Sequence, residues 1–279
     1  GEPKIRLYHW VASTGEATDV TDTETVAAGL NFPTDVEAAE NVGEGSVIGE
    51  DDVLVANAGT SGANAQSVLS LDVSQPWPID ATALTPVVSS ADVQMGEPLV
   101  NDPSGLSQFL DLLWISNAAS ATALYNAGTV SEIYTTGVFS LVYIDNDPPT
   151  ESFAGLVETS GVEFGGFSPN GTLSGDDYIS YQTNGNGSIT GIIVQEGLLF
   201  DVMEAGSFNE PTDLAFVPPL VPITAGDAEG TPAGWLFVTD AADNSIGVVT
   251  LATVGGAVGD DATWVIGQLT NTFTYSFLS

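Results

Sequence analysis

The stretches FNEPTDLAFV (Phe208–Val217) and GWLFVTDAADNSIGVVTL (Gly234–Leu251) decide the fold. In the second, an apolar run ends at Asp240, a short cluster of Ala, Asp and Asn follows, and Ser245 opens another apolar run. Asn and Asp favour the tight turns that join antiparallel strands, and the flanking runs are rich in Val, Phe and Ile. This stretch therefore predicts a β-hairpin, and the alternating residues after Pro211 predict one further strand before it.

The same frame recurs along the chain. Hairpin patterns of an apolar run, an Asn-containing or Asp-containing turn and a second apolar run occupy Asp51–Val73, Leu110–Gly128 and Asp176–Gln195. The Pro-Thr-Asp strand pattern recurs in NFPTDVEAA (Asn31–Ala39), before the first of these hairpins. Units that recur at intervals of roughly 40 to 65 residues predict radial or solenoid repetition of one small antiparallel sheet.

This repeat resembles the blade of NHL-type and related six-bladed β-propellers. The resemblance is best in the two opening stretches, where Pro and alternating apolar residues precede a hairpin with Asp or Asn at its turn. It extends over about half of the chain. Ser245 stands where those blades usually carry a basic residue, and the loop between Val217 and Gly234 is long and rich in Pro. The resemblance implies a fold and no particular activity, since propellers host many functions.

We therefore expect an all-β chain that forms a β-propeller of about six blades. Residues 1–279 would form a single domain, in which the N-terminal KIRLYHWVA and the C-terminal TFTYSFL strands share a blade and close the ring. A β-sandwich or jelly roll is the alternative, because it also consists of short strands and turns. The one expected exception to strand structure is a short helix over Ser104–Leu113, SGLSQFLDLL.

The charge balance of the chain is strongly one-sided. The sequence has 37 acidic residues and only two basic ones, Lys4 and Arg6, which gives a formal net charge of −35. Nucleic acids and anionic lipids are recognised through Lys and Arg, so neither is an expected partner. No apolar run of about 18 residues predicts membrane insertion. The acidic surface has two alternative interpretations: solubility in high salt, as in halophilic proteins, or specific binding of divalent cations.

Few residues in the chain could support catalysis. Cysteine is absent, and the single histidine, His9, lies in an expected strand, where a half-buried structural role is its ordinary interpretation. The sequence contains neither the Gly-x-Ser-x-Gly elbow of serine hydrolases nor the phosphate-binding Gly-rich loop of nucleotide enzymes. We therefore expect a protein that is not an enzyme.

Carboxylates are the only side chains with acid–base or metal-binding chemistry that the sequence contains in quantity. Calcium prefers such oxygen ligands. The densest cluster is DNDPPTE, and a second lies in the tight turn TDAADN. The alternative is that these acids are charged turn residues with no metal. The candidate calcium ligands are Asp145, Asn146, Asp147, Glu151, Asp240 and Asp243.

Three further features bear on binding. Asn170 and Asn186 begin N-glycosylation sequons in Gly/Asn-rich turns, although chance also produces such sequons in a chain rich in Ser and Thr. Trp77, in QPWPID, is the tryptophan with a loop context and a candidate exposed anchor. Lys4 and Arg6 form the one cationic patch, which could dock on an acidic neighbouring subunit.

The predicted function is that of an extracellular or particle-surface structural and interaction protein. It would be an acidic, propeller-like subunit of a surface layer, a filament or a virion, and it would associate with itself or with other surface proteins. The start at Gly1 rather than Met adds the expectation of a processed, exported product, with an incomplete start of the chain as the alternative. The alternative is a carbohydrate-binding or carbohydrate-cleaving propeller, with glycans as partners.

Overall fold

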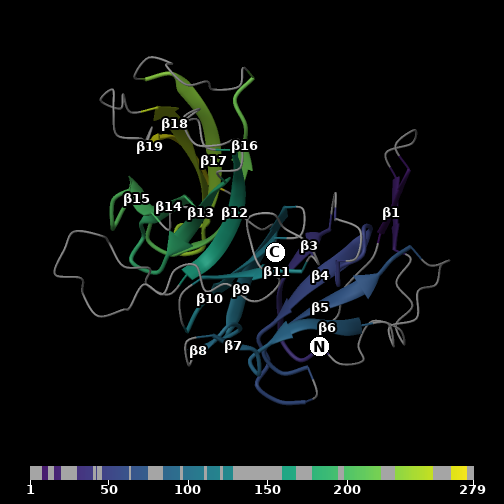
Figure 1. Ribbon diagram of the computed structural model, residues 1–279. Helices are drawn as coiled ribbons and strands as arrows, with labels where there is room; N and C mark the ends of the chain where they lie inside the picture. The colour runs from purple at the N-terminus through teal and green to yellow at the C-terminus, as the bar shows by residue number, and fades with distance from the viewer. Residues whose placement is uncertain are drawn as a thin grey trace. The chain divides into compact units, whose positions relative to one another are not determined.

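The computed structural model describes residues 8–11, 16–19, 30–39, 42, 46–62, 64–74, 84–94, 97–109, 112–119, 122–127, 159–167, 178–193, 198–220, 230–253 and 265–274. All regular elements in these ranges are β-strands, which confirms the all-β prediction (Figure 1). Within the same ranges, no helix has the length and apolar character needed to cross a membrane.

Antiparallel sheets whose strands follow chain order make up most of the described structure. Three have four strands, β3-β4-β5-β6, β12-β13-β14-β15 and β16-β17-β18-β19, and a further sheet, β9-β10-β11, has three. The pairs β1-β2 and β7-β8 form two small sheets. The strands are β1 (Tyr8–Val11), β2 (Glu16–Asp19), β3 (Pro33–Ala38), β4 (Asp52–Asn57), β5 (Ser67–Asp72), β6 (Leu84–Ser89), β7 (Val93–Gln94), β8 (Glu97–Pro98), β9 (Pro103–Phe109), β10 (Leu112–Asn117), β11 (Ala123–Asn126), β12 (Thr159–Phe167), β13 (Tyr178–Asn184), β14 (Ile189–Ile193), β15 (Leu198–Met203), β16 (Pro211–Val217), β17 (Pro232–Asp240), β18 (Ser245–Thr253) and β19 (Val265–Thr274).

The predicted hairpins are confirmed in all four places. They are the pairs β4-β5, β10-β11, β13-β14 and β17-β18. In the last, Asp240 pairs with Ser245, and Asn244 completes the turn with a positive φ of 47°. Asn tolerates this left-handed backbone better than most residues, which explains the composition of the turn. The Pro-Thr-Asp segments form β3 and β16, and each contains a bulge after its proline.

The helix predicted over Ser104–Leu113 is wrong. Residues Pro103–Phe109 form β9, and β10 begins at Leu112. The side chain of Asp35 in β3 accepts a hydrogen bond from the Leu106 N–H (2.7 Å), which ties this segment to a neighbouring sheet. A short apolar run fits a helix and a buried strand equally well, and pairing with other strands decided between the two.

The chain divides into two compact units, which we describe separately. Residues 1–115 and 124–140 form the first unit, and residues 116–123 and 141–279 form the second. In the first, Leu30, Val55 and Leu69 form a small core on the β3–β6 sheet. In the second, the β12–β15 and β16–β19 sheets share a larger core, which includes Tyr181, Leu236 and the neighbouring apolar residues of both sheets.

The number of blades and the closure of a ring stay predictions. Among the described strands, β1 pairs with β2 and β19 pairs with β18, so the two terminal strands lie in different sheets. The four-stranded meanders match the form expected of a blade, but the described residues contain fewer such sheets than the predicted six.

Candidate functional site

Each of the four large sheets places a buried Asn or Asp at the end of its second strand. In the β9–β11 and β12–β15 sheets these residues are Asn117 and Asn184, and in the β3–β6 and β16–β19 sheets they are Asn57 and Asp240. In the β3–β6 and β16–β19 sheets, the end of this strand lies beside the segment that leads into the sheet. Backbone N–H groups of that segment need acceptors, and a short Asx side chain can reach them.

Asp240 shows the role of this position most completely. Its Oδ2 accepts a hydrogen bond from the Asn209 N–H (2.8 Å), and its Oδ1 accepts from the N–H groups of Glu210 (3.2 Å) and Asp243 (3.3 Å). Asn57 does the same work in the β3–β6 sheet, where its Oδ1 accepts from the N–H groups of Asn31 (2.9 Å) and Phe32 (3.0 Å). These two side chains anchor the entry to their sheets, and we name Asn57 and Asp240 the Asx anchors. Asn184 acts differently, because its amide donates to the hydroxyls of Ser188 and Thr190 in its own hairpin.

The candidate calcium ligands of the Asp240 turn have protein partners in the structure. The anchor contacts use both oxygens of Asp240, and Oδ2 of Asp243 accepts a hydrogen bond from the Asn209 side-chain amide (2.8 Å). In the part of the chain that the structure describes, no three His, Cys, Asp or Glu side chains gather as a metal site would require. The cluster of Asp145, Asn146, Asp147 and Glu151 lies outside the described residues, so calcium binding there stays a prediction.

Of the other predicted binding residues, the structure describes only Asn186. It is exposed in the β13-β14 turn, and its Oδ1 accepts a hydrogen bond from the N–H of Ser188, the third sequon residue (3.0 Å). Use of this sequon stays a prediction. Lys4, Arg6, Trp77 and Asn170 lie outside the described residues.

A polar stripe lies buried along β13. Ser180, Gln182 and Asn184 alternate along this strand and therefore lie on one face of the sheet. Oε1 of Gln182 accepts a hydrogen bond from the Thr122 hydroxyl (2.6 Å), and the Asn184 amide donates to the hydroxyl of Ser188 (3.0 Å). The stripe is enclosed within the second unit, so it is an internal polar contact rather than a surface site.

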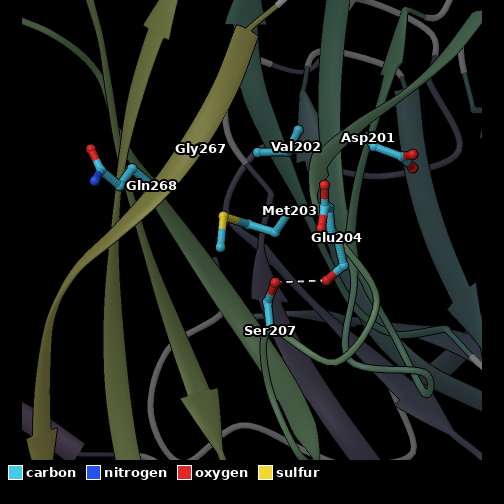
Figure 2. Close-up of a pocket in the computed structure, with 7 residues that line it drawn as sticks. All are labelled: Asp201, Val202, Met203, Glu204, Ser207, Gly267 and Gln268. Carbon is cyan, nitrogen blue, oxygen red and sulfur yellow. Dashed lines mark hydrogen bonds between the residues drawn. The ribbon is translucent and has the colours of Figure 1, made fainter.

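An open cleft lies between the outer strands of the two sheets of the second unit. Its volume is about 470 Å³. The strand β15 and the turn after it provide one wall, and β19 provides the other (Figure 2). The lining residues are Asp201, Val202, Met203, Glu204, Ser207, Gly267 and Gln268.

Gly267 lets the two walls approach. A Cβ atom at this position would lie 3.0 Å from the Met203 sulfur and 2.5 Å from a methyl carbon of Val249, so glycine is needed for the close contact. The side chain of Met203 points into the gap between the walls (Figure 2). The base of the cleft is therefore apolar, and its polar groups lie along the rim.

The polar groups of the cleft do not converge on one point. Asp201 and Gln268 point to opposite sides of the view in Figure 2, and the Ser207 hydroxyl donates to the backbone carbonyl of Glu204 (2.6 Å). Partial burial, and to a smaller degree the neighbouring Glu204 carboxylate, raises the pKa of Asp201 above its ordinary value. Acid–base catalysis needs groups directed at one reacting atom, so this arrangement suits binding better than turnover.

The described residues form an all-β protein whose four large sheets are antiparallel meanders. In each of them, an Asn or Asp ends the second strand. No protein-family description matches the chain, and no curated protein matches its sequence. Among solved structures, it is similar to an auxiliary nutrient binding protein from Bacteroides ovatus ATCC 8483, with 13% identity and a TM-score of 0.50 over 98% of this chain and 57% of that one. It is also similar to the WD40 repeats of RRP9, with 9% identity and a TM-score of 0.42 over 80% of this chain and 51% of that one.

A third similar structure is apo AztD from Citrobacter koseri, with 14% identity and a TM-score of 0.22 over 80% of this chain and 72% of that one. The chain spans only about half the length of the first two structures. At such identities the likeness concerns the fold alone.

Proposed function

We propose that this chain is a non-catalytic structural and interaction protein that works outside the cell. It would be an acidic subunit of a surface layer, an extracellular filament or a virion exterior. The observation that carries the proposal is the imbalance of 37 acidic residues against two basic ones. Such a body cannot neutralise its own carboxylates, so it depends on cations or neighbouring molecules in its surroundings.

The contacts of the buried acids support this proposal. Asp240 is held by backbone N–H groups, and buried Asp52 accepts a hydrogen bond from the Gly49 N–H (2.8 Å) and another from the Ser70 hydroxyl. Hydrogen-bond donors of the protein thus take the place that Lys and Arg fill in most proteins. The exposed acids face the solvent, where ions can screen their charge.

A β-propeller of about six blades, closed by the terminal strands, is part of the proposal. Its support is the recurrence of one meander with the same chain order in three four-stranded sheets of the described residues. A ring of such sheets leaves no long free edge, which suits a protein exposed on a surface.

Thermal unfolding across salt concentrations tests the proposal. The Debye length falls from about 10 Å at 0.1 M to about 3 Å at 1 M salt, so self-repulsion among the exposed acids should be strongly screened. We expect the Tm to rise by on the order of 5–10 °C over this range. Adding CaCl2 at constant ionic strength, with EDTA as its control, separates site-specific binding from screening. A Tm that is the same in salt-free EDTA buffer and in 1 M NaCl would contradict the proposal.

The cleft between β15 and β19 favours a second candidate function, glycan binding. Its volume of about 470 Å³ lies in the range of small-ligand sites. Carboxylate, hydroxyl and amide groups beside an apolar base are the groups that bind sugars, and we propose a sugar or polyol as its ligand. The similar structure from Bacteroides ovatus is described as an auxiliary nutrient binding protein, so it too is named for binding.

A pair of glutamate variants tests glycan binding. Glu204 lines the cleft, whereas Glu210 is an exposed glutamate outside the lining and serves as the matched control. For a glycan found on a microarray, we expect Glu204→Ala to weaken binding by about tenfold or more, as the loss of a charged hydrogen bond does. Glu210→Ala should leave calorimetric affinity unchanged. Equal effects of the two changes, or no binding by the wild type, would rule out this site.

A further inference from the structure

The polar stripe of β13 is completely buried. Ser180, Gln182 and Asn184 are each 0% exposed. The residues that pair with the first two of them in the neighbouring strands, Ile192 in β14 and Val162 in β12, are buried as well. Polar groups are stable in such surroundings only where they make hydrogen bonds, so each donor and acceptor of the stripe needs a partner.

One polar atom of each stripe residue has no hydrogen-bond partner in the part of the chain that the structure describes. These atoms are Oγ of Ser180, Nε2 of Gln182 and Oδ1 of Asn184. The other polar atom of each amide is in use, because Oε1 of Gln182 accepts from the Thr122 hydroxyl (2.6 Å). The amide nitrogen of Asn184 likewise donates to the Thr190 hydroxyl (2.9 Å). The unused atoms therefore recur at every second residue along one face of the strand.

The chemistry of the unused atoms defines what can bind them. Oδ1 of Asn184 only accepts hydrogen bonds, Nε2 of Gln182 only donates them, and the Ser180 hydroxyl does both. The amide N–H groups of Gln182 repel a metal cation, and the amide oxygen of Asn184 repels an anion. Water both donates and accepts, and it is small enough for a row of completely buried side chains.

The spacing of the stripe fits water molecules between its residues. Side chains at alternate positions of a strand lie about 6.7 Å apart. A water molecule makes hydrogen bonds of about 2.8 Å, so it joins polar atoms that are up to about 5.6 Å apart. The longer side chains of Gln182 and Asn184 can close the remaining gap. Three residues at this spacing provide two such positions, one on each side of Gln182.

We propose that the polar stripe binds two ordered water molecules, one between Ser180 and Gln182 and the other between Gln182 and Asn184. The two N–H groups of Gln182 donate one bond to each water. The Ser180 hydroxyl bonds to the first water, and Oδ1 of Asn184 accepts from the second, so every unused atom of the stripe gains a partner. The inference goes beyond the proposed function and does not depend on it, because it concerns neutral side chains inside the protein.

The two waters belong to a contact within the second unit. Thr122 is buried, and its hydroxyl bonds to the central residue of the stripe, Gln182. Both waters would bond to the same Gln182 side chain, which fixes the direction of its amide. The stripe with its waters therefore holds the segment around Thr122 against β13 through polar contacts rather than apolar packing.

A crystal structure of the full chain at high resolution tests the inference directly. We expect one water within about 3.2 Å of both Ser180 Oγ and Gln182 Nε2, and a second within that distance of Gln182 Nε2 and Asn184 Oδ1. A protein side chain bonded to these atoms instead, or a stripe without water, would overturn the inference.

Nuclear Overhauser effects between water and amide protons test the same positions in solution. We expect cross-peaks from the side-chain N–H groups of Gln182 to water, with the sign of a long-lived bound molecule. Thr122→Val is the control, since it removes a neighbouring hydroxyl whose proton exchanges with water. Cross-peaks that persist in this variant support bound water, whereas cross-peaks that disappear come from the hydroxyl and contradict the inference.

A pair of serine variants gives a third measurement, whose sign separates a hydrated hydroxyl from an unpartnered one. Ser67→Ala is the control, because Ser67 is also buried in a strand and its hydroxyl donates to the Asn64 carbonyl (2.7 Å). We expect Ser180→Ala and Ser67→Ala each to lower the Tm by about 2–4 °C, since both lose a hydrogen bond. Removing an unpartnered buried hydroxyl relieves a penalty, so a higher Tm for Ser180→Ala would overturn the inference.

Discussion

Replacing Asp240 with alanine is expected to lower the free energy of unfolding by about 3–4 kcal/mol. The carboxylate is buried and accepts hydrogen bonds from three backbone N–H groups, those of Asn209, Glu210 and Asp243. Alanine would leave these donors without their partner where water has limited access, and the full cost of an unmade bond then applies. Urea unfolding followed by tryptophan fluorescence measures the loss.

Asp240→Asn is the control that isolates the role of the acceptor. Asn57 holds the equivalent position and serves two N–H groups with one amide oxygen, which shows that a neutral acceptor suffices there. We expect this variant to lose about 1 kcal/mol, mainly from the weaker contact with the Asp243 N–H. An equally large loss in the Ala and Asn variants would mean that the charge, as for a metal ligand, is what matters.

The repeated hairpins could be predicted because their information is local. A turn such as AADN, with apolar residues on both sides, fixes two neighbouring strands whatever the rest of the chain does. The Asx anchors have a signal in the sequence as well. In each of the four hairpin patterns, an Asn or Asp ends the first apolar run, which forms the second strand of the sheet. From the sequence, these residues predict turns and candidate calcium ligands. The structure shows that Asp240 accepts hydrogen bonds from the N–H groups of Asn209 and Glu210, in the segment before β16.

The arrangement of the sheets could not be predicted in the same way. The strands β17 and β18 carry apolar residues on both faces, so composition does not show which other sheet packs against each face. The segment that became β9 failed as a helix for a related reason. Its ladder with β10, which follows it along the chain, and the bond from the Leu106 N–H to Asp35 in another sheet outweigh local preference.

The cleft was missed because its walls are distant in sequence. Asp201 and Gln268 come from the outer strands of two sheets, and only the packing of those sheets brings them near each other. Gly267, which permits the approach, looks in the sequence like any other glycine of a β-rich chain. Sites of this kind need the packing of the sheets before they can be recognised, whereas turns and anchors do not.

Replacing Gly187 with alanine is expected to destabilise the second unit by more than about 3 kcal/mol. Gly187 has a φ of +81°, and a Cβ there would lie 2.0 Å from the backbone oxygen of Phe208. That oxygen cannot move freely, because the Phe208 N–H donates to the Gly187 carbonyl (3.1 Å) and the Phe208 side chain is buried in the core. The β13-β14 turn would have to separate from the segment 206–208.

Gly206→Ala is the matched control, since it shares the backbone conformation without the collision. Gly206 has a φ of +80°, and no atom lies within 4 Å of the position that a Cβ would take there. Its cost should be about 1 kcal/mol, the usual penalty for alanine in the left-handed region. The difference between the two variants in urea unfolding therefore measures the contact between the turn and Phe208 alone. If both variants lose the same free energy, that contact adds nothing to stability, and strain at the left-handed backbone accounts for the whole effect.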